Sequence, residues 1–176
     1  LLTNDLTGKI VCFPTDTVYG VGALINDTVA IEKIYAMKKR DAVKPLAILT
    51  PTQDIDDYVK RVSVDARKLM DERWPGALTL IFDKSDNIDP LITKGIKTIA
   101  FRMPNSRVAL QILNHFGLMA TTSVNISGEK ELNSVSEIVD KFNEYLDYIV
   151  IDEEVTTNTP STIIDVTSED IKIIRK

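Results

Sequence analysis

The chain is most informative between residues 9 and 39, which read KIVCFPTDTVYGVGALINDTVAIEKIYAMKK. The β-rich run at 9–13 ends at Pro14, since proline interrupts a strand. The polar residues at 26–28 can cap an amphipathic helix that continues to about residue 39. The order strand, loop, helix is typical of α/β proteins.

The rest of the chain alternates in the same way before it turns to strands alone. We expect helices at 52–60, 64–73, 106–117 and 136–145. We expect strands at 46–49, 78–82, 98–103, 118–124, 148–151, 161–167 and 171–174. Because helices and strands alternate early and strands cluster late, the predicted fold class is α/β with a mixed sheet and helices on its faces.

Length and composition limit the class of protein. A chain of 176 residues with 44% hydrophobic and 27% charged residues is typical of one folded domain, here 1–176. A net charge of −5 argues against tight nonspecific binding to nucleic acid. No apolar run approaches the ~20 residues that span a bilayer, and no basic-then-apolar leader opens the sequence, so we expect a cytoplasmic protein with no membrane partner.

Several common sites are absent from the sequence. It contains no G-x-x-x-x-G-K-[ST] phosphate loop, no G-x-G-x-x-G turn and no Cys/His cluster with metal-ligand spacing. The single cysteine, Cys12, lies in an apolar run and is expected in the core. The single histidine, His115, falls near a helix end, where a structural role is favoured over catalysis.

Polar side chains instead gather at strand ends. Because side chains alternate along a strand, residues two apart share a face. The polar residues grouped in this way are Thr15 and Thr17, Thr98 and Arg102, and Thr121, Ser123 and Asn125. Strand hydroxyls often face water, but three such segments beside Pro or Gly favour one hydroxyl-lined wall. The cations Lys38, Arg40 and Lys44 end the first helix, where they either complement the helix dipole, are solvated, or line a site.

Seven short motifs together resemble the YrdC family of threonylcarbamoyl-AMP synthases and span nearly the whole chain. In order, they are PTDTVYGVG at 14–22, K-x-R at Lys38 and Arg40, Lys44-Pro45-Leu46, RWPG at 73–76 followed by Leu78-Thr79, FRMP at 101–104, S-x-N at Ser123 and Asn125 with Ser127-Gly128, and PSTIID at 160–165. Each motif is short, and their common order is the specific signal.

This resemblance implies an open, twisted α/β sheet with a concave, positively charged cavity. It implies a nucleotidyltransferase that converts L-threonine, bicarbonate and ATP to threonylcarbamoyl-AMP and pyrophosphate for tRNA modification. It also implies Mg²⁺ held by the triphosphate without protein ligands, and tRNA and a tRNA threonylcarbamoyl-transferase complex as further partners.

The resemblance also assigns residues. Implied ATP contacts are Lys38, Arg40, Lys44, Thr98, Ser123, Asn125 and Arg175, with Lys38 and Arg40 acting electrostatically and no side-chain nucleophile. Implied threonine contacts are Thr17, Arg102, Thr121 and Ser161, with Arg102 binding the carboxylate.

Loss of Lys38 or Arg40 is expected to reduce turnover by at least about tenfold, with little loss of folding stability. Two positions depart from the family pattern, Asp41 in place of proline and Leu49 in place of a histidine of some relatives. A loop at 129–134 is expected to close over the unstable carbamate. Two alternatives stay open: a noncatalytic RNA- or nucleotide-binding module, and a carbamoyl-transferring relative such as the related domain of hydrogenase-maturation proteins.

Overall fold

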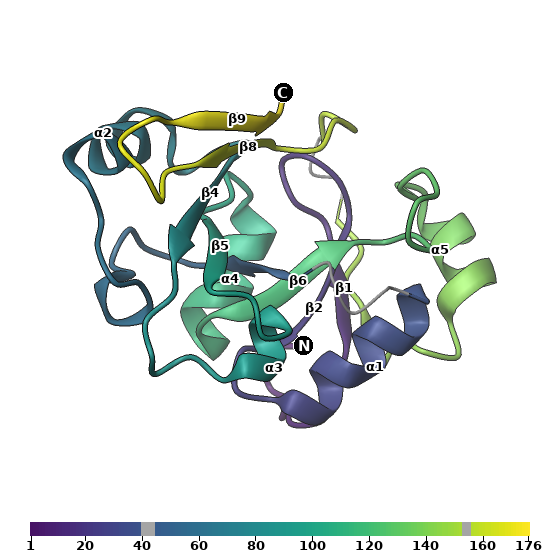
Figure 1. The fold of residues 1–176 in the computed structure, drawn as a ribbon. Helices are drawn as coiled ribbons and strands as arrows, with labels where there is room; N and C mark the ends of the chain where they lie inside the picture. The colour runs from purple at the N-terminus through teal and green to yellow at the C-terminus, as the bar shows by residue number, and fades with distance from the viewer. Residues whose placement is uncertain (40–44, 153–155) are drawn as a thin grey trace.

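A computed structural model describes residues 1–39, 45–152 and 156–176 of the chain. Within these residues one sheet of nine strands has the order β7-β1-β2-β6-β3-β5-β4-β8-β9 (Figure 1). The strands are β1 (Val11–Phe13), β2 (Gly20–Leu24), β3 (Ala47–Leu49), β4 (Leu78–Asp83), β5 (Thr98–Arg102), β6 (Met119–Ser123), β7 (Tyr148–Ile149), β8 (Thr162–Asp165) and β9 (Lys172–Arg175). The helices are α1 (Thr28–Lys38), α2 (Val64–Arg73), α3 (Pro90–Thr93), α4 (Arg107–Phe116) and α5 (Val135–Phe142), with a 3₁₀ turn η1 at Asp56–Tyr58.

The sheet is mixed, as the sequence predicts. Strands β1 and β7, β3 and β5, and β4 and β8 pair in parallel, and the other neighbours pair antiparallel. The α/β fold class is therefore confirmed. No described helix is long and apolar enough to cross a membrane.

One expected helix is wrong. The segment 52–60 forms only the short turn η1 rather than a helix through residue 60. The reason is tertiary: Val59 bridges Lys84, and the Lys60 N–H donates to the carbonyl of Asp83 at 2.9 Å. Pairing with the end of β4 thus overrides the local helical pattern.

One face of the sheet packs against helices and carries the larger of two hydrophobic cores. Asp27 caps α1 by accepting from the Ala30 N–H at 2.9 Å, and Ser63 caps α2 in the same way through Ala66. Apolar residues of α1, α2 and α5 then form one large core with the strand residues of this face, among them Cys12. The buried position of Cys12 matches the sequence expectation.

The opposite face is covered only in part. Helix α4 begins at Ser106, whose Oγ accepts from the Ala109 N–H and donates to the carbonyl of Pro14. The helix packs Val108, Ile112 and Leu113 on a second core with residues of β1, β3 and β6. The remaining part of this face, across β6, β3, β5, β4 and β8, borders that core and forms the floor of a pocket.

Candidate active site

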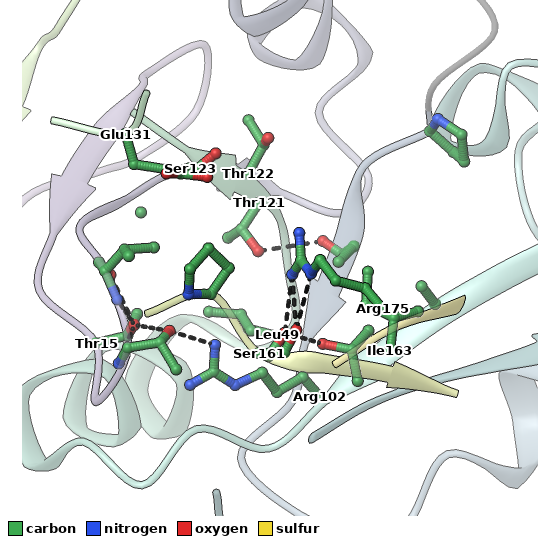
Figure 2. A pocket seen from close by; sticks show the side chains of 18 of the residues that line it. Thr15, Leu49, Arg102, Thr121, Thr122, Ser123, Glu131, Ser161, Ile163 and Arg175 are labelled. Atoms are coloured by element: carbon green, nitrogen blue, oxygen red, sulfur yellow. Dashed lines mark hydrogen bonds between the residues drawn. The ribbon is translucent and has the colours of Figure 1, made fainter. Parts of the chain in front are cut away.

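The pocket has a volume of about 320 Å³ and is shown in Figure 2. Its floor is the uncovered sheet face, and its walls come from the segments around Thr15 to Gly20, Glu131 and Pro160. The polar and charged side chains that line it are Thr15, Thr17, Thr79, Arg102, Thr121, Thr122, Ser123, Glu131, Ser161 and Arg175. This volume lies at the small end of the range for pockets that bind small molecules.

Strand register brings the floor residues together from distant parts of the chain. Gly22 is opposite Thr121, Thr121 is opposite Ala47, Ala47 is opposite Ala100, and Ala100 is opposite Ile81. Gly22, which does not itself line the pocket, gives Thr121 room at the end of this row, since a Cβ there would lie 2.6 Å from Cγ2 of Thr121.

Arg102 is the central cation of the pocket. Its side chain is 8% exposed. Its Nε donates to the carbonyl of Gly76 at 3.0 Å, one terminal nitrogen donates to Oγ1 of Thr17 at 2.7 Å, and the other donates to the carboxylate of Asp16. These three contacts use three of the five guanidinium N–H groups and leave two for a ligand.

The RWPG motif at 73–76 supplies one of these contacts. Nε1 of Trp74 donates to the carbonyl of Leu78 at 2.7 Å, and the Gly76 N–H donates to the carbonyl of Met103 at 2.8 Å. A Cβ at Gly76 would lie 2.4 Å from the Arg73 carbonyl oxygen, so only glycine fits this turn. The motif therefore positions a carbonyl against Arg102.

Thr17 supports Arg102 through a chain of hydroxyls. The Thr15 hydroxyl donates to the carbonyl of Val18 at 2.7 Å, which uses its only proton. The 3.0 Å contact between the two threonine hydroxyls must then have Thr17 as its donor. Since Thr17 also accepts from Arg102, its hydroxyl has no proton left for a ligand and can only accept.

The second guanidinium comes from β9. Arg175 donates to the carbonyl of Ser161 from Nε at 3.0 Å and from a terminal nitrogen at 2.8 Å. The Ser161 hydroxyl is in turn hydrogen bonded to Oγ1 of Thr79 at 2.8 Å. Figure 2 shows the Arg102 and Arg175 side chains on two sides of Ser161.

Burial and neighbouring charge act in opposite directions on both arginines. Burial lowers the pKa of Arg102, and the Asp16 carboxylate partly offsets this shift. Burial also lowers the pKa of Arg175, against the attraction of Glu131. An arginine stays protonated in proteins despite such shifts, so the pocket presents two cations and one lining carboxylate among its described residues.

Lys38 does not line the pocket as the structure describes it. It is 1% exposed, and its Nζ donates to the carbonyls of Ser123 and Asn125 at 2.5 and 2.9 Å and to Oδ1 of Asn125 at 2.6 Å. This burial argues against the expectation that loss of Lys38 hardly affects folding, because a buried ammonium with these bonds holds the S-x-N turn together. Its contact with ATP stays a prediction.

Asn125 shares this internal role. Its Oδ1 also accepts from the Ser123 hydroxyl at 2.8 Å, and its Nδ2 donates to the carbonyl of Glu129 at 2.7 Å. The loop 129–134 is further tied by the bond from the Leu132 N–H to Val124 and by Asn133, which accepts from the Tyr19 N–H at 3.1 Å. The loop thus forms a wall of the pocket, and its closure over a ligand stays a prediction.

The structure brings together six of the predicted site residues and separates others. The pocket contains Thr17, Arg102, Thr121, Ser123, Ser161 and Arg175. Thr98 is half-buried at the start of β5, opposite Asp83, and does not line the described pocket. Arg40, Asp41 and Lys44 lie outside the described residues.

Some residues of the pocket were not among the predicted ligand contacts. Thr79 lines it, and Asp16 pairs with Arg102. Leu49, one of the two departures from the family pattern, and Glu131 of the loop 129–134 line it as well. Strand alternation could have found Thr79, since Thr79 and Ile81 share a face of β4. No sequence signal pairs Asp16 with Arg102. His115 is exposed on α4 and does not line the described pocket.

The described residues contain no group of three or more His, Cys, Asp or Glu side chains that could hold a metal ion. Glu131 is the one carboxylate among the described lining residues, and a magnesium ion held by a ligand's phosphates stays a prediction. Within this part of the chain, hydroxyl and guanidinium groups are the available recognition elements.

These features define an α/β protein of a single mixed sheet that has a pocket lined by hydroxyl and guanidinium groups on the uncovered part of one sheet face. The family model described as "Telomere recombination", which covers Sua5, YciO and YrdC, matches residues 6–176. The chain belongs to this Sua5/YciO/YrdC family.

Individual relatives agree. The chain is 35% identical over 162 residues to threonylcarbamoyl-AMP synthase of Pyrococcus abyssi, covering 91% of this chain and 48% of that protein. It is 31% identical to threonylcarbamoyl-AMP synthase of Pseudoalteromonas translucida, covering 90% and 87%. The chain thus spans about half the length of the Pyrococcus relative and most of the Pseudoalteromonas one.

Solved structures of family members have the same fold as this chain. P. abyssi Sua5 complexed with L-threonine matches with a TM-score of 0.89 at 35% identity, covering 96% of this chain and 50% of that one. Escherichia coli YciO matches with a TM-score of 0.84 at 25% identity, covering 96% and 83%. The open mixed sheet predicted from the resemblance is therefore confirmed.

Proposed function

We propose that this chain is an L-threonylcarbamoyladenylate synthase, a nucleotidyltransferase that makes threonylcarbamoyl-AMP and pyrophosphate from L-threonine, bicarbonate and ATP. The observation that carries the proposal is the convergence of Arg102, Thr121, Ser161 and Arg175 in one pocket. Its support from relatives is the name shared by the P. abyssi and P. translucida proteins, and the threonine complex of P. abyssi Sua5.

Threonine is held by charge and by hydroxyl pairing. The two N–H groups of Arg102 that the protein does not use bind its carboxylate. Thr121 donates to the carbonyl of Ala47 at 3.2 Å, so its hydroxyl accepts from the ligand, and Ser161 offers a second hydroxyl. Valine leaves these groups unpaired at a cost of about 1–3 kcal/mol per buried group. Serine, which lacks only a methyl group, is the harder competitor.

ATP lies toward the Arg175 and Ser123 side of the pocket. Arg175 has guanidinium N–H groups beyond those bonded to Ser161, and these contact phosphate. Arg40 and Lys44 add positive charge, and Thr98 is a further proposed contact. Lys38 and Asn125 act by fixing the turn that presents Ser123. Mg²⁺ bound to the triphosphate would supply positive charge to offset the charge that develops on the leaving pyrophosphate.

The chemistry needs no side-chain nucleophile. Bicarbonate takes up one proton and loses water to give carbon dioxide. The neutral threonine amine then adds to the carbon dioxide and releases one proton, which gives a carbamate. A carbamate oxygen then forms a bond to the α-phosphorus as the bond to pyrophosphate breaks. The protein positions the two reactants, stabilises negative charge and limits water access.

The product's further use is also proposed. Threonylcarbamoyl-AMP passes to a tRNA threonylcarbamoyl-transferase complex in the cytoplasm, where the tRNA itself is the final acceptor. Direct contact between this chain and tRNA is a separate proposal, which the net charge of −5 does not favour.

One assay separates the proposed enzyme from its two alternatives. The chain is incubated with labelled ATP, and pyrophosphate release is followed with threonine and bicarbonate each present or omitted. Release that needs both supports the synthase. No release under any condition indicates a noncatalytic binding module, and release that does not depend on threonine indicates a carbamoyl-transferring relative.

A further inference from the structure

The Arg102 guanidinium already has a carboxylate partner within the protein. It donates to Oδ1 of Asp16, and the two side chains are 8% and 16% exposed. Water screens such a shielded pair much less than an ion pair on the surface. A ligand carboxylate that binds Arg102 therefore meets a second negative charge on the same guanidinium.

Asp16 is held in this position by its neighbours. Its carbonyl accepts from the Thr157 N–H at 3.1 Å, and it lies between the two threonines whose hydroxyls are fixed by internal hydrogen bonds. Gly76 fixes the guanidinium from Nε. The ion pair is therefore already formed in the ligand-free pocket. A ligand carboxylate that reaches Arg102 binds beside Asp16 and does not displace it.

Two consequences follow from this arrangement. The three protein contacts fix the guanidinium plane, which orients the two remaining N–H groups toward a ligand. At the same time, the Asp16 charge opposes the attraction between Arg102 and any second carboxylate. The orientation of Arg102 and the charge of Asp16 can be separated by Asp16→Asn, because asparagine keeps an oxygen acceptor for Arg102 and removes the negative charge.

We propose that Asp16 sets the affinity of the pocket for carboxylate ligands. It orients Arg102, and its charge lowers the affinity of Arg102 for the carboxylate of threonine. The product retains this carboxylate, so its affinity is lowered as well. This proposal rests on the function proposed above. Weak binding of this group favours turnover, since tight binding of substrate and product alike does not lower the chemical barrier and slows product release.

Asp16→Asn tests the proposal directly by calorimetric titration of the full chain with L-threonine. The expected result is a dissociation constant lower than that of the unchanged protein by about threefold or more, with a smaller change for L-threoninamide, which lacks the carboxylate. The matched control is Glu131→Gln, which removes a carboxylate from the same pocket with no described hydrogen bond to Arg102. It should change threonine affinity less than Asp16→Asn does.

Three results would overturn the proposal: unchanged or weaker threonine binding by Asp16→Asn, an equal change for threoninamide, or an equal effect of Glu131→Gln.

A measurement on the unchanged protein covers the case in which the variant does not fold. In the unchanged protein, the dissociation constants of threoninamide and threonine should differ by less than about tenfold. A larger ratio would contradict the claim that the Asp16 charge opposes binding of the threonine carboxylate. Threonine binding that Asp16→Asn leaves unaltered refutes the role of Asp16 alone, whereas no threonine binding to the unchanged protein refutes the proposed function with it.

Discussion

Replacing Lys38 with methionine should destabilise the ligand-free protein. Methionine keeps most of the apolar stem of the 1% exposed lysine and removes the ammonium that donates to Ser123 and Asn125. Three acceptors then lose a donor, but Oδ1 of Asn125 keeps the Ser123 hydroxyl. At about 1 kcal/mol for each of the two carbonyls, the free energy of unfolding falls by about 2 kcal/mol. For a chain of this size, that loss lowers the melting temperature by about 4–8 °C.

The assay is thermal and urea unfolding without ligand, with Lys39→Asn as the matched control. Lys39 is exposed next to Lys38, and its φ of 46° suits asparagine. The control removes the same charge and should change the free energy of unfolding by less than about 0.5 kcal/mol. If the Lys38 variant unfolds like the unchanged protein and loses only ATP affinity, the internal role of Lys38 is refuted and direct contact with phosphate is favoured.

Two further predictions concern the core of the sheet. Gly22→Ala should lower the free energy of unfolding by about 1–3 kcal/mol through overpacking, because the new Cβ would lie 2.6 Å from Cγ2 of Thr121. Urea unfolding should show that Thr121→Ser, which removes Cγ2, restores most of the loss in the double variant, and no restoration would contradict this packing. Burial raises the pKa of Cys12 to about 12, so the native thiol should resist a thiol-specific reagent at pH 8 and react once urea unfolds the chain. Rapid modification of the folded protein would contradict the described core.

Alternation along strands predicted much of the site. Thr121 and Ser123 reach the pocket from β6, and Arg102 reaches it from β5, because residues two apart share a face. Motif resemblance placed Ser161 and Arg175 as well. Local patterns are sufficient at these positions, since strand direction alone decides which way each side chain points.

Contacts between distant segments could not be predicted in this way. The burial of Lys38 depends on the turn after β6, 85 residues further along the chain. The pairing of Asp16 with Arg102 depends on how the loop before β2 lies over β5. The segment 52–60 has a helical pattern and instead pairs with the end of β4. In each case tertiary packing, rather than local sequence, determines the outcome.

A crystal structure of the chain soaked with L-threonine and a nonhydrolysable ATP analogue would probe the pocket most directly. We expect the threonine carboxylate within hydrogen-bond distance of Arg102, its hydroxyl near Thr121 or Ser161, and the phosphates on the Arg175 side of the uncovered sheet face. Threonine bound at a site that excludes Arg102, or nucleotide on the helix-covered face, would contradict the account.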